Sequence, residues 1–438
     1  MDELHYFVIK LDSLADFGAD EMPLETARGI IKLLNNFLYT SYDGIGTVYE
    51  LEQERPFVSD LHRYWNRHYE DILDVEIDAA ACSKVAECLH GAWVRTNGKA
   101  FSELYDTYGL DSEAVCRVRF LTANQDFKTS LDFKKLAAAY KRDKSIFDER
   151  RILNNPEAFL STLKLGDLSQ SDKRAKFAKT TCKFLIDRRS SPYGLIDYYG
   201  HDLTGLREDL INCVGAGYGN KKTDMFIRDM CVLGVWKNVS GFEAIDVASD
   251  SNTMKVALRT GIITTAIPLV SSFLDYFGLQ YTAVERASAA AWRTVWEIWR
   301  EKYPHDSPES PCLLDYFVYD VVGKQFCKEI LVTYTCENGH VTKGKSGKRK
   351  CPVCKGTFQT KSKNLPCEDA EGYLALKETA FYKSHMAKPN YTHCPFESVC
   401  IEYDSRGLNP PKAISILGRT GWAEAYAYRD MGGGGISS

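Results

Sequence analysis

The 438-residue sequence lacks an uncharged apolar run of about 18 residues, the length that a helix needs to span a bilayer. The best candidate, Thr260–Phe277, is interrupted by Pro268 and contains Asp275, so we expect a buried helix there instead. The segment Met1–Asp20 carries several acids and has no sustained apolar stretch, which argues against a signal peptide. These absences predict a cytoplasmic protein with no membrane partner.

The sequence also has no internal repeat and no large excess of charge of one sign. It contains 55 Lys and Arg against 59 Asp and Glu, a formal net charge of −4. The composition, 44% hydrophobic and 26% charged, excludes a long disordered or collagen-like chain. The charge balance argues against a protein that coats nucleic acid with its whole surface, but it is compatible with a locally basic groove.

Apolar residues recur at three- and four-residue spacing from Asp71 to Trp299, which predicts a mainly α fold. Before this region we expect a short strand at Tyr6–Leu11 and a helix around Leu24–Leu38. The clearest helical patterns are Phe133, Leu136, Ala137 and Tyr140, and Trp292, Val295, Trp296 and Trp299. We divide the chain into a mostly helical region (1–104), a helical domain (105–330), a zinc-ribbon insertion (331–366), a cysteine-containing segment (367–430) and a flexible glycine-rich tail (431–438).

Cysteine is abundant, with 14 residues, and eight of these lie between positions 312 and 400. The other six are scattered through helical-looking sequence. In a reducing compartment, scattered cysteines are usually small buried hydrophobic residues, whereas a cluster with CxxC spacing is more often a metal site. We therefore expect six buried, inert thiols: Cys82, Cys88, Cys116, Cys182, Cys213 and Cys231.

Within the cluster, the sequences CENGH and CPVC supply two pairs of candidate ligands. The first pair is Cys336 and His340, and the second is Cys351 and Cys354. One pair on each of two tight turns is the pattern that a tetrahedral zinc ion requires, so the spacing predicts zinc in a small ribbon.

The ribbon is basic. Between Glu337 and Glu368 there are eight cations and no acid. The whole chain has a net charge of −4, so the rest of the chain without these eight cations carries −12. A basic ribbon on an acidic body indicates contact with DNA phosphates, with a solvated loop as the alternative. The candidate DNA contacts in this run are Lys348, Arg349 and Lys350.

A glycine-rich turn with Gly215, Gly217 and Gly219 separates two helical segments, of which the second begins at Lys221. Backbone amides in such a turn, and the positive end of the second helix, can hold a DNA phosphate without reading its sequence. Further along, Asp250 stands at the N-terminus of an amphipathic segment.

Together these segments resemble the helix-hairpin-helix (HhH-GPD) DNA glycosylase superfamily, with the endonuclease III and archaeal 8-oxoguanine glycosylase branches nearest. Three further pieces carry the resemblance. Arg119–Lys128 is similar to the family's early helix, which ends in a turn bearing a glutamine, here Gln125. Leu314–Cys327 is similar to the helix before the iron–sulfur loop, and His393–Cys400 to the end of that loop. The pieces follow one another in the family's order.

The resemblance implies a two-lobed helical glycosylase-like domain that excises an oxidised or modified purine, such as 8-oxoguanine, after flipping it from duplex DNA. It also implies AP lyase activity. Lys222 matches the family's lysine nucleophile, and Asp250 matches its catalytic aspartate. Lys221 competes with Lys222, and Asp246 with Asp250. The resemblance also implies that Gln125 and the three turn glycines contact DNA.

The iron–sulfur ligands are matched only in part. Cys327, Cys394 and Cys400 stand at family positions, but about 66 residues separate the first two and the family's second cysteine is missing. Cys367 or His393 would have to replace it to hold a 4Fe–4S cluster. Otherwise Cys394 and Cys400 join a second zinc site.

Two other classes of function stay open. The scaffold can be a catalytically repurposed protein that binds a nucleobase, a nucleic acid or a protein partner from a bacterial anti-phage (CBASS-type) operon. Its acidic net charge favours this hypothesis, and the matching positions of Lys222 and Asp250 oppose it. The third class is a zinc-stabilised helical interaction protein.

Overall fold

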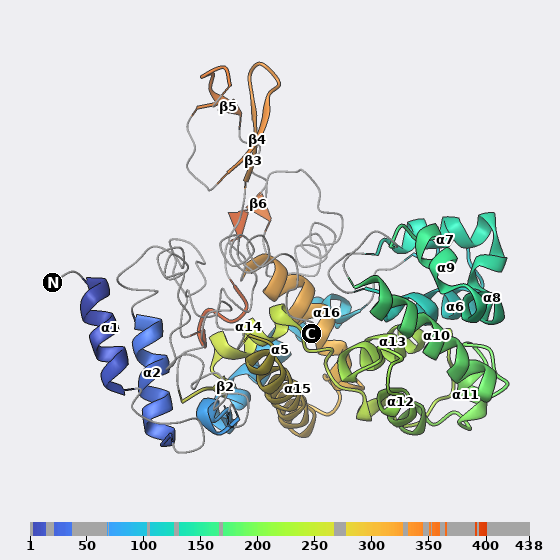
Figure 1. Ribbon diagram of the computed structural model, residues 1–438, viewed down its shortest axis with the longest axis horizontal. Coiled ribbons are helices and arrows are strands. Elements are labelled where there is room, and N and C mark those ends of the chain that lie inside the picture. Colours follow the sequence, from blue (N-terminus) through green and yellow to red (C-terminus); the bar gives the residue numbers. More distant parts are fainter. Residues whose placement is uncertain are drawn as a thin grey trace. The chain divides into compact units, whose positions relative to one another are not determined.

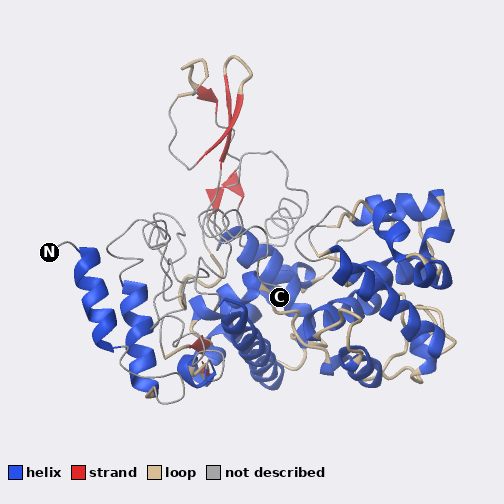
Figure 2. Ribbon diagram, viewed as in Figure 1, coloured by secondary structure: helices blue, strands red, loops and turns tan. Residues whose placement is uncertain are grey.

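The structure is a computed structural model, and it describes residues 3–14, 22–36, 68, 70–102, 106–126, 131–165, 170–266, 277–326, 332–344, 350–351, 353–359, 364–365, 390–391 and 394–400. Helices contain 64% of the described residues and strands only a small share, so the prediction of a mainly α protein is confirmed (Figure 2). No described helix is long and apolar enough to cross a membrane.

The chain forms two compact units, which are described separately. Unit 1 comprises residues 1–100, 249–306 and 317–438, and unit 2 comprises residues 101–248 and 307–316. Each unit therefore combines segments that are distant in sequence.

Unit 2 consists of short helices (Figure 1). Its α-helices are α6 (Ser112–Ala123), α7 (Phe133–Arg142), α8 (Glu149–Asn154), α9 (Pro156–Thr162), α10 (Ser171–Asp187), α11 (Leu195–Tyr198), α12 (Leu203–Asn212) and α13 (Asn220–Val232). Short 3-10 turns are η3 (Lys144–Phe147), η4 (Phe242–Ala244) and η6 (Pro311–Leu313), and η2 (Lys99–Phe101) lies at the unit boundary. Aspartate carboxylates accept backbone N–H groups at the starts of several helices, and each such cap contributes about 1 kcal/mol. The capping residues include Asp111, Asp132, Asp148 and Asp202.

An aromatic cluster forms part of the core of unit 2. The Phe120 ring on α6 stacks on the Tyr218 ring at 5.3 Å between centroids, and the Phe226 ring on α13 meets the Trp236 ring edge-on at 5.4 Å. The Tyr218 hydroxyl also donates to the backbone carbonyl of Phe120. The cluster therefore fixes the turn that precedes α13 against α6. The predicted apolar face of α7 is buried as well: Phe133, Leu136, Ala137 and Tyr140.

Unit 1 contains a long helix pair, α5 (Ala79–Thr96) and α15 (Phe277–Lys302). The rings of Trp93 and Trp299 meet edge-on at 5.8 Å, and the Cys82 thiol lies 3.9 Å from the carbonyl oxygen of Ala291. The predicted apolar face of α15 is buried: Trp292, Val295, Trp296 and Trp299. Unit 1 also contains α1 (Glu3–Leu14), α2 (Leu24–Asn36) and α14 (Ser251–Thr260).

Two expectations from the sequence are wrong. The segment Tyr6–Leu11 lies within helix α1 rather than in a strand; a helix pairs its backbone groups internally, and α1 packs against α2. The expected helix at 260–277 is also wrong where the segment is described. Gly261, in the left-handed region at φ +72°, ends α14. Strand β2 (Ile263–Thr264) then pairs antiparallel with β1 (Glu76–Ile77). Residues 267–276 lie outside the described part. The predicted helix around residues 24–38 is confirmed as α2.

The segment predicted as a helix at residues 314–327 has two parts. Helix α16 (Leu314–Phe317) continues as a π-helix, η7 (Val318–Phe326), and Cys327 lies outside the described residues. Single π-type turns occur frequently at functional sites, and this nine-residue stretch packs against α14.

The predicted ribbon is a three-stranded antiparallel sheet in the order β4-β3-β5 (Figure 1). The central strand β3 (Val332–Cys336) pairs with β4 (Val341–Gly344) and with β5 (Phe358–Gln359). The register places Cys336 opposite Phe358, at the end of the central strand. Farther along the chain, β6 (Asn364–Leu365) pairs in parallel with β7 (Asn390–Tyr391). The lysines and arginine at positions 345–349, including Lys348 and Arg349, lie outside the described residues.

Candidate functional site

The glycine-rich turn joins α12 to α13, as the sequence predicts. Gly215 and Gly217 adopt left-handed φ values of +89° and +74°. A Cβ atom on Gly217 would lie only 2.5 Å from the Phe177 ring, so glycine is required there for both reasons. Gly219 precedes α13 and provides no side-chain cap. The first N–H groups of α13 therefore lack a side-chain cap and can donate to an acceptor from outside the helix, as in an anion site.

Lys222 lies in the first turn of α13 and is half-buried. Its Nζ donates a hydrogen bond to the backbone carbonyl of Asp126. Removal from water disfavours the ammonium form and lowers the pKa of Lys222 to about 8. The charge of Asp126 opposes this change, whereas the charges of Lys221 and Arg174 reinforce it. A lowered pKa is one of the properties that an amine nucleophile needs.

The Asn124–Asp126 turn, which follows α6, is held by side chains on both sides. Asn124 Nδ2 donates to Thr181 Oγ1 and to the carbonyl of Ala216 in the hairpin turn, each at 2.8 Å. These bonds connect the turn to α10 and to the hairpin. The carbonyl that accepts from Lys222 is therefore fixed relative to α13.

Gln125, predicted as a DNA contact, is fully buried. Its Nε2 donates to the carbonyl of Arg174 at 3.2 Å, and Arg174 Nη1 donates back to the carbonyl of Gln125 at 2.6 Å. Within the described chain, Gln125 Oε1 has no hydrogen-bond partner. The structure thus places Gln125 beside the candidate lysine but inside the protein. Sequence reasoning missed Arg174, because one arginine among the lysines of an amphipathic helix gives no signal of burial.

Asp250 caps the N-terminus of α14. Its Oδ1 accepts hydrogen bonds from the backbone N–H groups of Asn252 at 2.7 Å and Thr253 at 3.1 Å. Thr253 Oγ1 accepts in return from the Asp250 N–H at 2.7 Å, which completes a capping box. The predicted position at a helix N-terminus is confirmed. The π-helix η7 packs closely here, since a Cβ atom on Gly323 would lie 2.8 Å from Asn252 Cβ.

The competing aspartate, Asp246, has a different environment. Its carboxylate lies 3.5 Å from Arg207, which also holds the buried Asp224 at 2.9 Å. Asp246 thus belongs to an ionic network of unit 2 that connects to α13. Lys222 is a residue of unit 2, and Asp250 is a residue of unit 1.

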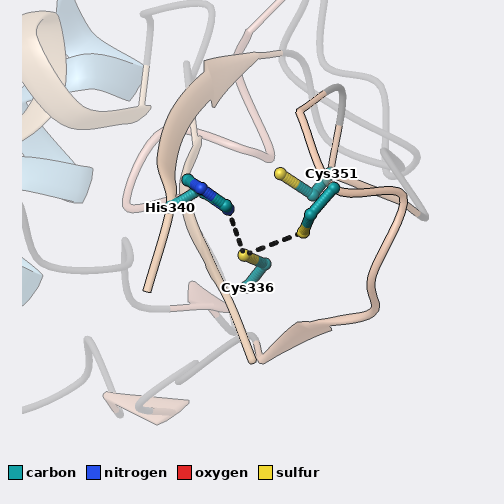
Figure 3. Close-up of side chains that lie close together, drawn as sticks. Cys336, His340 and Cys351 are labelled. Atoms are coloured by element: carbon teal, nitrogen blue, oxygen red, sulfur yellow. Dashed lines mark hydrogen bonds between the residues drawn. The ribbon is translucent and has the colours of Figure 1, made fainter. Parts of the chain in front are cut away.

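The four predicted zinc ligands come together in the ribbon. Their ligand atoms all lie within 4.8 Å of one another, and the structure shows that this group can hold a metal ion. Cys336 Sγ lies 3.4 Å from His340 Nδ1 (Figure 3) and 3.5 Å from Cys354 Sγ. Cys351, the other ligand labelled in Figure 3, is fully buried. No second group of three or more such side chains is found among the described residues.

Local contacts favour the thiolate form of one candidate ligand. The Gly356 N–H and the Asn338 side chain donate to Cys354 and lower its pKa to about 6. A thiol with a lowered pKa is a thiolate at neutral pH, the form that binds metal. A Cβ atom on Gly356 would lie 2.6 Å from Glu337 Oε1, the end of an exposed side chain that can move aside, and 3.3 Å from Cys354 Sγ.

The remaining candidate ligands are described only in part. Cys394 is buried and Cys400 half-buried at the two ends of a turn in which the N–H of Cys400 donates to the carbonyl of Phe396 at 2.8 Å. Cys327, Cys367 and His393 lie outside the described residues, so the iron–sulfur assignment stays a prediction. Lys350 is exposed on the ribbon, and its backbone forms an isolated antiparallel β-bridge with that of Thr357.

The scattered cysteines fit the expected structural role. Cys82, Cys116 and Cys182 are fully buried, and burial raises the pKa of each thiol. The other three are half-buried, again with pKa values raised mainly by burial: Cys88, Cys213 and Cys231.

No known family model matches the chain, and no curated protein is similar enough to match it. The likeness to the glycosylase superfamily therefore rests on the sequence motifs.

Proposed function

We propose that the chain is a DNA glycosylase with AP lyase activity that excises an oxidised or modified purine such as 8-oxoguanine. The observation that carries the proposal is the state of Lys222, whose pKa is lowered from 10.5 to about 8. An amine attacks only when uncharged. With a pKa of about 8, roughly a tenth of the amines are uncharged at pH 7, against fewer than about one in a thousand at the ordinary value.

In the proposed reaction, Lys222 Nζ attacks the sugar C1′ and the bond from C1′ to the base breaks. The base leaves with the bonding electrons and takes up the proton that the amine loses. The sugar ring then opens to a Schiff base, and loss of a C2′ proton expels the 3′ phosphate. The resemblance assigns to Asp250 the role of the catalytic aspartate, a carboxylate that stabilises developing positive charge.

The hairpin supports DNA binding in this proposal. The uncapped start of α13 and the amides of the Gly215–Gly219 turn can hold a backbone phosphate, a contact that positions DNA without reading its sequence. The proposed fold is the two-lobed helix-hairpin-helix domain. The exposed Lys350 and Lys355 of the ribbon add two candidate phosphate contacts.

Zinc is the metal that we propose for the ribbon. Three thiols and one imidazole form a closed Cys3His donor set, which is typical of structural zinc. Such a site has no open position for a substrate. Zinc would therefore stabilise the ribbon rather than take part in excision.

The test is an 8-oxoguanine duplex incubated with the wild-type chain and with Lys222→Gln. We expect base release, strand cleavage and a borohydride-trapped protein–DNA adduct for the wild type, and no adduct for Lys222→Gln. Lys221→Gln is the matched control, because it removes the neighbouring charge but keeps the candidate nucleophile. The proposal fails if the wild type gives neither base release nor an adduct on any of a panel of modified-purine duplexes.

A second candidate function is binding of a nucleobase, a nucleic acid or an operon-encoded protein without excision. The net charge of −4 favours it. A salt series on unmodified duplex DNA separates the glycosylase from a module that binds a nucleobase or a protein, and the absence of base release separates it from a module that binds nucleic acid. A DNA enzyme that neutralises several phosphates should lose affinity steeply as salt rises, whereas a nucleobase- or protein-binding module should not.

A further inference from the structure

Two cationic side chains donate hydrogen bonds to backbone carbonyls of consecutive residues in the turn after α6. Arg174 Nη1 donates to the carbonyl of Gln125 at 2.6 Å, and Lys222 Nζ donates to the carbonyl of Asp126. Arg174 comes from α10 and Lys222 from α13. Because adjacent residues of one turn bind both groups, the two positive charges are held close together.

The charges around the Lys222 amine are unequal. Arg174, Lys221 and Asp126 are the ionisable groups that act on it, two cations against one carboxylate. Arg174 is completely buried, and a guanidinium keeps its charge at every pH at which the protein is folded. Its charge is therefore a fixed feature of this part of unit 2.

We propose that Arg174 is a positioning residue for Lys222: it holds the turn whose carbonyl accepts from the Lys222 amine, and its buried charge adds to the effect of burial in favouring the uncharged amine. The catalytic meaning of this role rests on the proposed glycosylase function, but the charge coupling itself is a property of the protein without DNA. A second cation beside a lysine is a known way to activate an amine nucleophile.

The test measures the titration of Lys222 in the full-length protein in the absence of DNA. Competitive acetylation over a pH series, followed by peptide mass spectrometry, gives the pH at which Lys222 loses its proton. The variants are Arg174→Gln, which removes the charge but keeps a donor, and Arg174→Lys, which keeps the charge. Asp126→Asn is the third variant, since it removes the opposing carboxylate. Circular dichroism checks that each variant is folded.

We expect half-maximal labelling of wild-type Lys222 near pH 8. Arg174→Gln should move it upward by a few tenths of a pH unit, Arg174→Lys should leave it unchanged, and Asp126→Asn should move it downward. An unchanged curve in folded Arg174→Gln overturns the proposal. If Arg174→Gln does not fold, Asp126→Asn provides the test. A lower labelling midpoint for Lys222 would support control of its protonation by the charges around this turn, and an unchanged midpoint would overturn the proposal. A wild-type curve centred near pH 10.5 also overturns it.

These outcomes are independent of glycosylase activity. A low Lys222 midpoint that depends on Arg174, together with no reaction on modified DNA, would leave the coupling intact and reject the proposed function. Conversely, base excision with an unchanged curve in Arg174→Gln would keep the function and reject the role of Arg174.

Discussion

Arg174 and Lys222 donate hydrogen bonds to the carbonyls of two consecutive residues, Gln125 and Asp126. The same turn is fixed to the hairpin through Asn124, which binds the carbonyl of Ala216. Three segments distant in sequence thus converge on the amine that we propose as the nucleophile. The arrangement makes the reactivity of Lys222 depend on pH.

The first prediction concerns the pH dependence of lyase activity. Because only uncharged Lys222 attacks, we expect the rate of adduct formation to rise about tenfold per pH unit below pH 8 and to level off above it. Single-turnover trapping from about pH 6 to about pH 10 measures this profile. A rise that continues to pH 10.5 would mean that Lys222 has an ordinary pKa and that the environment does not activate it.

The second prediction concerns stability. The folded protein holds Lys222 at a pKa of about 8, below its value of 10.5 in an unfolded chain. Between these pH values the unfolded state binds more protons than the folded state, so the free energy of unfolding rises with pH. The loss of stability caused by burying the charged Lys222 amine is fully present below pH 8. Lys222→Met should therefore stabilise the protein at neutral pH.

One pH unit of pKa change corresponds to about 1.4 kcal/mol. Because Lys222 is half-buried and partly screened by water, we expect a smaller gain than the full pKa change implies, about 1–2 kcal/mol. Urea unfolding at neutral pH and again above pH 10.5 measures the gain, which should vanish at the higher pH. Lys221→Met is the control. Equal stability of Lys222→Met and wild type at neutral pH would contradict the prediction.

A third prediction uses two glycines of the same turn. Gly217→Ala should destabilise the protein by about 2–3 kcal/mol, since it adds strain at φ +74° and a Cβ atom against Phe177. Gly219→Ala should be nearly neutral, because its φ is −92° and no atom lies within 4 Å of the added Cβ. Urea unfolding compares them. Equal losses in the two variants would show that the turn does not have the described geometry.

The sequence predicts the elements of this site better than their contacts. Helical periodicity and the glycine-rich turn correctly place Lys222 at the start of α13 and Asp250 at the start of α14. These features are local: a turn needs left-handed φ values, and a cap needs an oxygen at one position. Likewise, the spacing of Cys336, His340, Cys351 and Cys354 suffices to predict a metal site.

The contacts between distant segments could not be predicted in this way. The pairing of Arg174 with the carbonyl of Gln125 depends on how α10 packs against the end of α6, which a single sequence does not encode in any short pattern. For the same reason Gln125 is buried although it was expected to contact DNA. The strand expected at Tyr6–Leu11 failed because the choice between strand and helix depended on a neighbour, α2.

A fourth prediction concerns the position of Asp250. Gly323 lets the π-helix approach the start of α14, where a Cβ atom would lie 3.0 Å from the carbonyl oxygen of Asn252. Gly323→Ala should cost about 1–3 kcal/mol, because backbone has to move to accept the methyl group. Gly29→Ala is the control: it lies in α2 of the same unit with only Leu14 at 4.0 Å, and should stabilise by about 0.5–1 kcal/mol. Thermal unfolding separates them. No loss in Gly323→Ala would contradict the close approach.

The last prediction concerns the metal centre. We expect the purified chain to bind one zinc ion at the ribbon, and Cys351→Ser to lose it, because a closed tetrahedral site needs all four ligands. Metal analysis after dialysis, combined with competition by a chelator, measures this. Cys213→Ser is the control, since its thiol lies outside the group and belongs to unit 2, whereas the turn that holds Cys394 and Cys400 belongs to unit 1. Affinity should fall as the pH is lowered, because protons compete for the thiols and the imidazole.

If Cys351→Ser keeps its zinc with unchanged affinity, the ion is bound elsewhere, and Cys394 and Cys400 become the first candidates. Iron in the protein in addition to zinc would support the cluster predicted from Cys327, Cys394 and Cys400.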